Sequence, residues 1–377
     1  MYERFGLVLT VNHACNLRCT YCYTGEKFNR VMPIHISERA IDRAISSIDL
    51  HGTLELGFFG GEPMIESQLI ATLMRYARKC ADPSDLDVQI TITTNGTITD
   101  PVARSVMMDD DVELTISFDG VPSVHDRHRL TIAGQPTSRD VIDTMKMLLE
   151  TGKVFNVSMV VRPDTVEHLG DGIRFLRSIG VTHVTPTLDL WTGWNSNDGR
   201  KLLDAVSECA DLWREGLPEC GISWFDQKAY ELARRTGGGF ADSARCGFGA
   251  GEVAVAPSGR LYPCERVMGE DRDDNPMRLR GDVMDGQDFL SIAPQQKRCD
   301  DACDVCSMQS LCNTTCRCSN FIRTGNPSQP DRLLCMWNEA CLREAIRVGV
   351  PAEAGSSAVP SSGAIKIERP AEAGTPT

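Results

Sequence analysis

The chain has 377 residues, with 39 basic and 52 acidic side chains and a net charge of −13. Hydrophobic residues make up 41% and charged residues 24%, which are usual values for a soluble globular protein. The sequence contains no run of about 18 uncharged apolar residues, so no transmembrane helix is predicted. The acidic balance argues against nucleic acid as the main partner, since phosphate binding needs a basic surface. The length predicts two domains, or one large domain with an appendage.

Short β-rich runs alternate with helical patterns in the first half of the chain. The helical patterns show apolar residues at helical spacing, and we expect Ser37 to cap the first helix. Six strands that alternate with helices predict parallel pairing and an α/β fold, either an open sheet or a partial or full (β/α) barrel. Polar and glycine motifs follow several strands, which predicts an active site at that edge. The predicted strands are Leu7–Val11, Leu54–Phe59, Val88–Thr93, Val112–Phe118, Asn156–Val161 and Val181–Leu188.

The composition changes after two further predicted helices, Arg200–Glu215 and Trp224–Arg235. A glycine-rich stretch at 237–239 marks a boundary, and the chain beyond it is rich in cysteine and loops up to a predicted helix at about Leu333–Arg347. The last segment is rich in Pro, Ala, Gly and Ser, so it cannot bury enough surface to order itself. We therefore predict three parts: a barrel with following helices at 1–236, a cysteine-rich domain at 237–349 and a disordered tail at 350–377.

The sixteen cysteines are unevenly placed. Cys15, Cys19 and Cys22 fall within eight residues, and ten others lie between Cys246 and Cys341. The amino-terminal segment lacks the features of a secretory signal, which predicts a cytoplasmic protein in a reducing compartment. Clustered thiols in that compartment usually indicate metal or redox chemistry, although disulfides stay open if the protein is exported by another route.

Three thiolates on one loop can bind three corners of a cubane iron–sulfur cluster and leave the fourth iron open. A zinc site or scattered core cysteines are the alternatives, but the triplet lacks the second pair that zinc sites usually have. The string CNLRCTYCY closely resembles the signature of the radical S-adenosylmethionine (SAM) superfamily, including Tyr21 before the third cysteine. The resemblance implies a [4Fe–4S] cluster that binds SAM and cleaves it to a 5′-deoxyadenosyl radical, which abstracts a hydrogen atom from the substrate.

Further motifs at the strand ends agree with this resemblance. Gly60-Gly61-Glu62-Pro63 matches the GGEP motif of the family, which implies that it binds the amino group of SAM. A segment running from Ser117 to His125-Asp126-x2-Arg129 is also similar to relatives. We expect His125 and His128 to have surface or capping roles. The implied cofactor-binding residues are Tyr21, Gly60, Gly61, Glu62, Pro63, Asn95, Ser117 and Arg129, the last two as contacts to the SAM ribose or carboxylate.

The carboxyl-terminal cysteines resemble the seven-cysteine pattern of SPASM domains, which follow the barrel in many peptide- and protein-modifying relatives. Val253–Ala256 and Arg260–Tyr262 are predicted to form a β-hairpin within this pattern. The resemblance implies two auxiliary [4Fe–4S] clusters and therefore three clusters in all. One would be bound by Cys303, Cys306, Cys312 and Cys335, and the other by Cys246, Cys264 and Cys316.

The fourth ligand of the second auxiliary cluster is open, because the stretch before Cys246 has no cysteine. Cys220 is slightly favoured for this place, and an open iron that contacts substrate is the alternative. A structural zinc site is a further alternative, because it needs four thiolate ligands and Cys303, Cys306, Cys312 and Cys316 supply that number. The cysteines left over are expected to be buried small residues; they are Cys80, Cys209, Cys299, Cys318 and Cys341.

The resemblance implies a peptide or protein substrate. The leading hypothesis is a peptide maturase that crosslinks or oxidises a ribosomal precursor peptide. An anaerobic sulfatase-maturating enzyme and a non-catalytic iron–sulfur or zinc protein are the alternatives. We expect a reductant such as flavodoxin or ferredoxin. Because the chain begins directly at the barrel, we expect the leader to be bound either by a separate leader-recognition protein or by the barrel mouth and the carboxyl-terminal domain. No residue identifies itself as the catalytic base, although Asp189, Glu252 and Glu265 are candidates to face the cavity.

Overall fold

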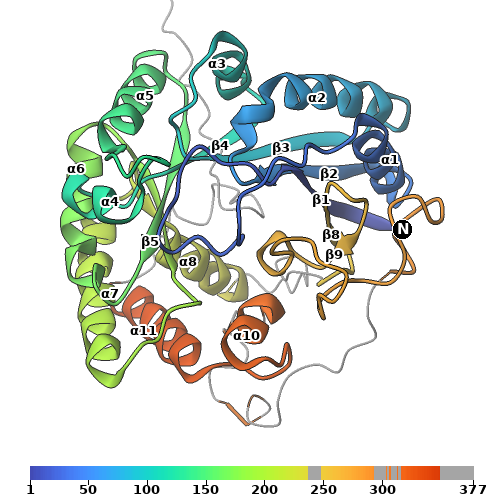
Figure 1. Cartoon of the computed structure of the whole chain (residues 1–377). Helices are drawn as coiled ribbons and strands as arrows, with labels where there is room; N and C mark the ends of the chain where they lie inside the picture. The colour runs from blue at the N-terminus through green and yellow to red at the C-terminus, as the bar shows by residue number, and fades with distance from the viewer. Residues whose placement is uncertain (237–247, 293–302, 304, 307–311, 313–315, 349–377) are drawn as a thin grey trace, which may run out of the picture.

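The computed structural model describes residues 1–236, 248–292, 303, 305, 306, 312 and 316–348. These residues form a nine-stranded sheet in the order β7-β6-β5-β4-β3-β2-β1-β8-β9. All neighbouring pairs are parallel except β8 and β9. The sheet curls into part of a barrel, with helices on its outer side (Figure 1). The predicted α/β fold with a partial barrel is therefore confirmed.

The strands are β1 (Tyr2–Asn12), β2 (Ile48–Gly60), β3 (Asp87–Thr94), β4 (Val112–Ser117), β5 (Phe155–Val161), β6 (His183–Leu188), β7 (Gly221–Ile222), β8 (Glu252–Val255) and β9 (Leu261–Tyr262). The α-helices are α1 (Ile34–Ile45), α2 (Ser67–Ala81), α3 (Pro101–Met108), α4 (Pro122–His128), α5 (Ser138–Glu150), α6 (Leu169–Ser178), α7 (Ser196–Gly216), α8 (Ser223–Thr236), α10 (Arg317–Thr324) and α11 (Arg332–Val348).

The expected cap at Ser37 is wrong, because α1 begins three residues earlier. Pro33 takes the N-cap position, and the Ser37 hydroxyl donates to the Ile34 carbonyl at 2.9 Å inside the helix. The short helix α3 was not predicted. Asp100 caps it by accepting from the amides of Val102 and Ala103 at 3.0 and 3.1 Å, which is a usual start for a helix.

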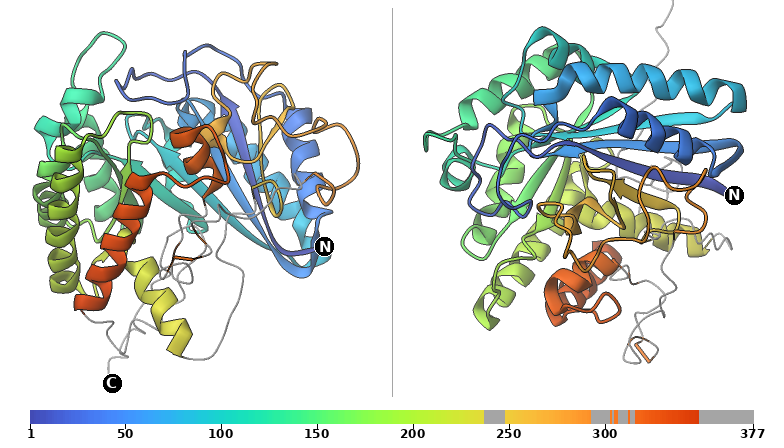
Figure 2. Two further views of the ribbon diagram at one scale, coloured as in Figure 1. Left: turned by 90° about the horizontal axis from the view of Figure 1, so that it is seen from below. Right: turned by 45° about the vertical axis from the view of Figure 1, so that its right-hand side comes forward.

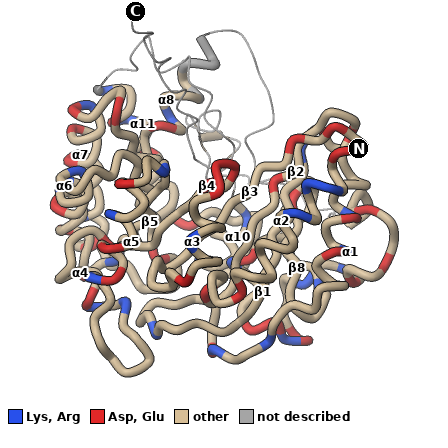
Figure 3. The backbone as a smooth tube through the Cα atoms, turned by 90° about the horizontal axis from the view of Figure 1, so that it is seen from above, with Lys and Arg blue, Asp and Glu red and all other residues tan. Residues whose placement is uncertain are grey.

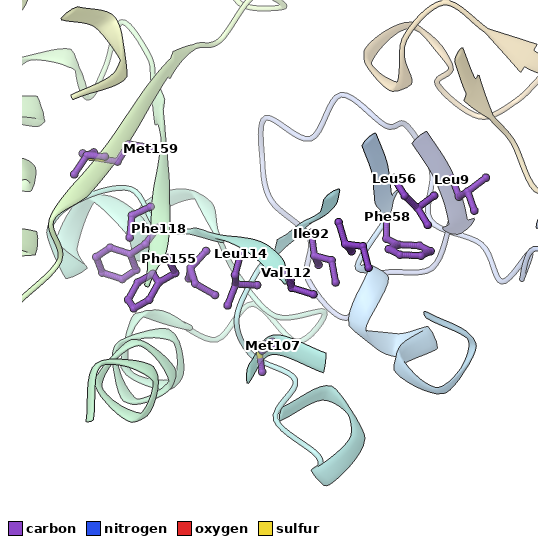
Figure 4. Close-up of a cluster of buried hydrophobic side chains, with 14 of the residues drawn as sticks. Leu9, Leu56, Phe58, Ile92, Met107, Val112, Leu114, Phe118, Phe155 and Met159 are labelled. Atoms are coloured by element: carbon purple, nitrogen blue, oxygen red, sulfur yellow. The ribbon is translucent and has the colours of Figure 1, made fainter. Parts of the chain in front are cut away.

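Residues alternate along the central strands between an apolar outer face and a hydroxyl-rich inner face. Ile90 and Ile92 of β3 are buried on the helix side, while Thr91 and Thr93 between them are half-buried. The same alternation in β4 and β5 places Ser117 and Ser158 on the inner face. Figure 4 shows part of the resulting apolar layer, from Leu9 of β1 across to Met159 of β5. Because side chains alternate along each strand, the helix-facing side of the sheet forms the apolar core and the side that faces the barrel interior is polar.

The predicted hairpin is present, and it extends the barrel sheet. Its first strand, β8, pairs in parallel with β1, with Gly6 opposite Glu252 and Leu9 opposite Val255. Helix α11 packs against α7 and α8 (Figure 2). Arg347 of α11 bonds to Asp211 of α7 at 2.8 Å. The two sides of the predicted boundary at 237 thus share one sheet, and the three-part division stays a prediction. The predicted tail at 350–377 lies outside the described residues.

Charged side chains of both signs are interspersed on the outer helices (Figure 3). Arg174 of α6 and Glu208 of α7, for example, form an ion pair of 2.7 Å between neighbouring helices. Both side chains are well exposed, so this pair contributes little to stability. Among the helices in the described ranges, none has the length and apolar character that crossing a membrane requires.

Arg43 joins α1 to the segment that follows β9. Its guanidinium is buried and donates to the carbonyls of Asp282, Val283 and Asp288 at 2.6 to 3.2 Å. The same group lies 4.2 Å from the centre of the Phe289 ring, a cation–π contact. One side chain therefore holds a long loop against the barrel.

We predict that Arg43→Met lowers the free energy of unfolding by about 3 kcal/mol, because it leaves buried carbonyls without donors. Urea denaturation followed by circular dichroism measures this. Arg75→Met on the exposed side of α2 is the matched control and should change stability by less than about 0.5 kcal/mol. Equal effects of the two changes would contradict the role given to Arg43.

Candidate functional site

The three clustered cysteines lie on the loop that leaves β1 at the carboxyl edge of the sheet. Cys15, Cys19 and Cys22 all line one cavity of about 270 Å³, here called the inner cavity. The Leu17 amide donates to the Cys15 sulfur at 3.3 Å, and the Cys22 amide donates to the Cys19 carbonyl at 3.2 Å. The loop thus turns its three thiols toward the same space, as a shared metal cluster requires.

Asn12 fixes both ends of this loop, and the sequence did not single it out. Its side-chain oxygen accepts from the amides of Ala14 and Arg30, each at 3.0 Å. Its side-chain nitrogen donates to Asn29 at 3.0 Å and to Glu66 at 2.6 Å. Asn12 is fully buried, so these bonds are shielded from water. One amide group therefore closes the base of the cysteine loop.

The two glycines of the GGEP segment allow the end of β2 to touch the cysteine loop. The Gly61 amide donates to the Asn12 carbonyl and the Glu62 amide to the Ala14 carbonyl, both at 2.9 Å. A Cβ atom on Gly60 would lie 2.3 Å from the Asn12 oxygen, and one on Gly61 would lie 2.2 Å from the Ala14 oxygen. Only glycine permits this close backbone approach.

Glu62 links the ends of β2 and β3. Its carboxylate accepts from the Met64 amide at 3.0 Å, the Thr94 hydroxyl at 2.6 Å and the Asn95 amide at 2.7 Å. Asn95 in turn donates to Asn16 of the cysteine loop at 2.9 Å. Glu62 lines the inner cavity, and burial raises the pKa of its carboxyl group despite the three donors. Its expected contact to the SAM amino group stays a prediction.

A buried ion pair lies below the cysteine loop. Asp119, just after β4, accepts from the Tyr21 hydroxyl, from the Val160 amide at 3.0 Å and from the Arg129 Nε at 3.1 Å. Burial alone would raise the pKa of Asp119, but the positive charge of Arg129 outweighs it and lowers that pKa. The guanidinium groups of Arg129 and Arg162 lie 5.4 and 5.5 Å from the Tyr21 ring centre. Tyr21 is therefore held at a fixed place beside the cysteines.

The expected surface or capping roles of both histidines of α4 are wrong, because both side chains are buried and hydrogen-bonded inside the protein. The His125 ring bonds to the Asp119 amide at 3.3 Å and to the Thr137 hydroxyl at 3.0 Å. The His128 ring bonds to the Thr20 hydroxyl at 2.7 Å and to Asp164 at 2.9 Å. Each ring therefore uses both nitrogen atoms within the protein.

The far wall of the inner cavity comes from the end of β6 and from the segment after β9. Asp189 pairs with Arg162 and accepts from the Trp191 amide at 3.0 Å. Glu265 and Arg266 line the same cavity, whereas Glu252 is not part of its lining. Of the predicted cofactor-binding residues, all eight line the inner cavity: Tyr21, Gly60, Gly61, Glu62, Pro63, Asn95, Ser117 and Arg129.

An outer cavity of about 620 Å³ adjoins the inner one and shares Tyr23, Trp191 and Arg266 with it. The rings of Tyr23 and Trp191 stack with their centres 4.5 Å apart and their planes 8° apart. The rest of the outer wall is formed by Gly25, by most of residues 267–276 and by Phe321 and Ile322 of α10. This second space could not be predicted from the sequence, because its walls come from four distant segments.

The structure gathers part of each predicted auxiliary cysteine set. The charges of Cys306 and Cys312 both act on the Cys335 thiol, and the Cys312 sulfur accepts from Asn338 at 3.2 Å. Cys264 and Cys316 border one apolar cluster. Cys246 lies outside the described residues. The ligand roles of these residues, and of Cys303, stay predictions.

Cys220 lies at the other end of the barrel. Its neighbour Gly221 pairs with His183, the first residue of β6, whereas Arg323 of α10 donates to Leu190 and Thr192 just beyond the end of that strand. Six residues of β6 separate these two levels by roughly 20 Å. The structure therefore places Cys220 beside the amino end of β6, and its role as a cluster ligand stays a prediction.

Comparison with known proteins finds a family match over part of the chain. Residues 9–176 match the model of the Radical SAM superfamily. An uncharacterized protein, MJ0907 of Methanocaldococcus jannaschii, is 29% identical over 48% of this chain, and the match spans 60% of that protein's length. The radical SAM cyclopropyl synthase TigE of Paramaledivibacter caminithermalis is 22% identical over 90% of this chain and 74% of its own. A serine-type anaerobic sulfatase-maturating enzyme of Klebsiella aerogenes is 23% identical over 82% and 78%.

Solved structures share the fold. Native anSMEcpe with bound AdoMet and Cp18Cys peptide has a TM-score of 0.75 and 20% identity, covering 91% of this chain and 97% of that one. Streptococcus suis SuiB bound to precursor peptide SuiA has a TM-score of 0.61 and 15% identity, covering 88% and 76%. The matched residues carry a radical SAM domain, and a domain of this superfamily implies SAM and a [4Fe–4S] cluster.

The residues present suit that cofactor pair. Three thiols and the GGEP segment line a single cavity, and burial raises the pKa of Cys15 to about 12. A buried thiol of this kind is deprotonated when a metal binds it, because the positive charge replaces the lost proton. Cys15, Cys19 and Cys22 would therefore hold the cluster, and the strand ends around them would hold SAM.

We predict that Asn12→Ala reduces iron binding at the cysteine loop, because the amides of Ala14 and Arg30 lose their shared acceptor. Iron analysis and electron paramagnetic resonance of the anaerobically purified protein measure this, and we expect at least a threefold fall in the signal that responds to SAM. Asn29→Ala, which removes only one of the four bonds, is the matched control and should keep most of that signal. A normal signal in Asn12→Ala would contradict the claim that Asn12 holds both ends of the cysteine loop in place.

Proposed function

We propose that this radical SAM enzyme modifies a peptide, abstracting a hydrogen atom from one residue of a ribosomal precursor and forming a side-chain crosslink or an oxidised residue. The observation that carries the proposal is the pairing of the inner cavity with the larger outer cavity. The inner one has the residues to hold the cofactors, and the outer one offers room for a chain that extends beyond the reacting residue. The relative TigE and the fold neighbour SuiB, which was solved with its precursor peptide, support this class of substrate.

We further propose that residues 237–349 form a SPASM domain with two auxiliary [4Fe–4S] clusters. The convergence of Cys306, Cys312 and Cys335, and the nearness of Cys264 to Cys316, support it. Clusters of this kind supply and accept single electrons. A cytoplasmic location and a flavodoxin or ferredoxin as reductant complete the proposal, and a separate leader-recognition protein is compatible with it.

Bound SAM and its cluster supply the radical that removes a hydrogen atom from the substrate. The chain's own residues must place the target carbon and exclude water. Tyr23 and Trp191 form an aromatic wall between the two cavities, which suits them to position the reacting residue. In a net loss of two hydrogens the substrate also gives up one proton and one electron, so a base must lie in the inner cavity.

Glu265 is the best candidate for this base. Of the cavity carboxylates, Glu62 is held by three donors and Asp189 is paired with Arg162. Within the described residues, Glu265 accepts one hydrogen bond, from the Cys264 thiol at 3.3 Å. Its carboxylate is therefore the least committed of the three and the most able to receive a proton.

We predict that Glu265→Gln lowers the rate of product formation about 100-fold, the usual contribution of general base catalysis, while formation of 5′-deoxyadenosine continues. Mass spectrometry of both products measures the two rates. Glu252→Gln is the matched control. Burial and the nearby Glu265 raise the pKa of Glu252 to about 8, so its carboxyl is mostly protonated at pH 7 and the amide should replace it with little loss. Equal effects of both changes would exclude Glu265 as the base.

A second candidate is anaerobic sulfatase maturation, because several of the curated relatives carry that activity in their names and the structure shares the fold of anSMEcpe. Anaerobic incubation with candidate peptides decides between the two, read by tandem mass spectrometry. The proposed function predicts a loss of about two hydrogens per event in a precursor peptide. Aldehyde formation in a short Cys- or Ser-containing sulfatase peptide would establish the second candidate instead.

A further inference from the structure

Cys318 is a fully buried cysteine that the sevenfold cysteine pattern leaves without a role. It lies in the first turn of α10, two residues after Cys316, which is the N-cap of that helix. Its side chain lies in the same buried apolar cluster as the Cys264 side chain, close enough for the two thiols to interact. Two cysteines that are 54 positions apart in the sequence thus meet side by side.

The surroundings of this pair resemble the lining of a buried cluster site. Cys264 and Cys318 belong to one apolar cluster with Phe248, and Cys316 packs against the same cluster. The Ser319 hydroxyl donates to the Cys316 sulfur at 3.2 Å, as polar groups do around iron–sulfur clusters. The guanidinium of Arg266 lies close enough to Cys264 and Cys316 to interact with the charge of both.

Other side chains are less suitable than Cys318 as the fourth ligand of the auxiliary cluster. Cys220 lies beside the start of β6, at the edge of the sheet opposite the loop that carries Cys15, Cys19 and Cys22. The carboxylates of Glu252 and Glu265 reach within 4.8 Å of the Cys264 sulfur, but iron–sulfur clusters favour thiolate ligands over carboxylates. Cys318 has the preferred ligand atom and already touches Cys264.

We propose that Cys318 binds the same auxiliary [4Fe–4S] cluster as Cys264 and Cys316, taking the place that the sequence pattern leaves open. This inference rests on the proposed auxiliary clusters, and it replaces both Cys220 and an open iron. Three of the four ligands would then come from described residues that border a single apolar cluster. A cluster with four thiolate ligands has no iron free for substrate, so its role would be to transfer electrons.

The test uses the full chain with Cys15, Cys19 and Cys22 changed to alanine, so that only auxiliary clusters remain. This parent should bind about eight iron atoms per chain, four for each cluster. Adding Cys318→Ala should remove between one and four of them and produce a [3Fe–4S] signal in electron paramagnetic resonance. Adding Cys341→Ala, which removes another fully buried thiol in α11, should leave about eight. Adding Cys220→Ala should also leave about eight.

A variant that keeps the shape of the side chain separates ligation from packing. Cys318→Ser should retain the fold but change the cluster's reduction potential and Mössbauer spectrum, because oxygen replaces sulfur on one iron. Unchanged iron content and spectra in both Cys318 variants would overturn the inference, as would a loss of iron confined to Cys220→Ala. A parent that binds no iron would instead refute the auxiliary clusters themselves, which is a separate result.

Discussion

The backbone contact between the end of β2 and the cysteine loop is the constraint on which the site depends. Two glycines let the β2 chain approach Asn12 and Ala14 so closely that no side chain fits between them. The loop is thereby fixed against the sheet edge, and Asn12 closes it at both ends. Three thiols on a short, fixed loop can share one metal cluster without a further folding cost.

The charged residues next to the cysteine loop are buried, and this burial makes each of them depend on its partner. Asp119 and Arg129 are almost fully buried and compensate each other, and together they hold Tyr21 beside the cysteines. Removing one partner of such a pair is costly because it leaves an isolated charge in a dry interior. The pair therefore fixes the part of the inner cavity beside the cysteines, while Trp191 is more exposed and stacks on Tyr23.

Motifs made of neighbouring residues could be predicted from the sequence, and contacts between distant segments could not. The cysteine triplet, the GGEP segment and the six alternating strands are local patterns, and the structure places the three thiols and the eight predicted cofactor residues in one cavity. The role of Asn12 could not be predicted, because its partners Asn29 and Glu66 lie 17 and 54 positions away in the sequence. The pairing of β8 with β1 and the meeting of Cys318 with Cys264 likewise depend on how the chain returns to its start. The ligand role of Cys220 stays a prediction, since spacing carries no information about which end of a strand a loop occupies.

The central claim is that the loop after β1 binds the cluster that cleaves SAM. Its most direct test is to incubate the anaerobically purified chain and its Cys19→Ala variant with SAM and dithionite, and to measure 5′-deoxyadenosine and methionine by liquid chromatography. The account predicts that the unaltered chain forms both products in equal amounts and that the variant forms neither while it retains its other iron. Equal product formation by the variant, or none by an iron-loaded unaltered chain, would contradict it.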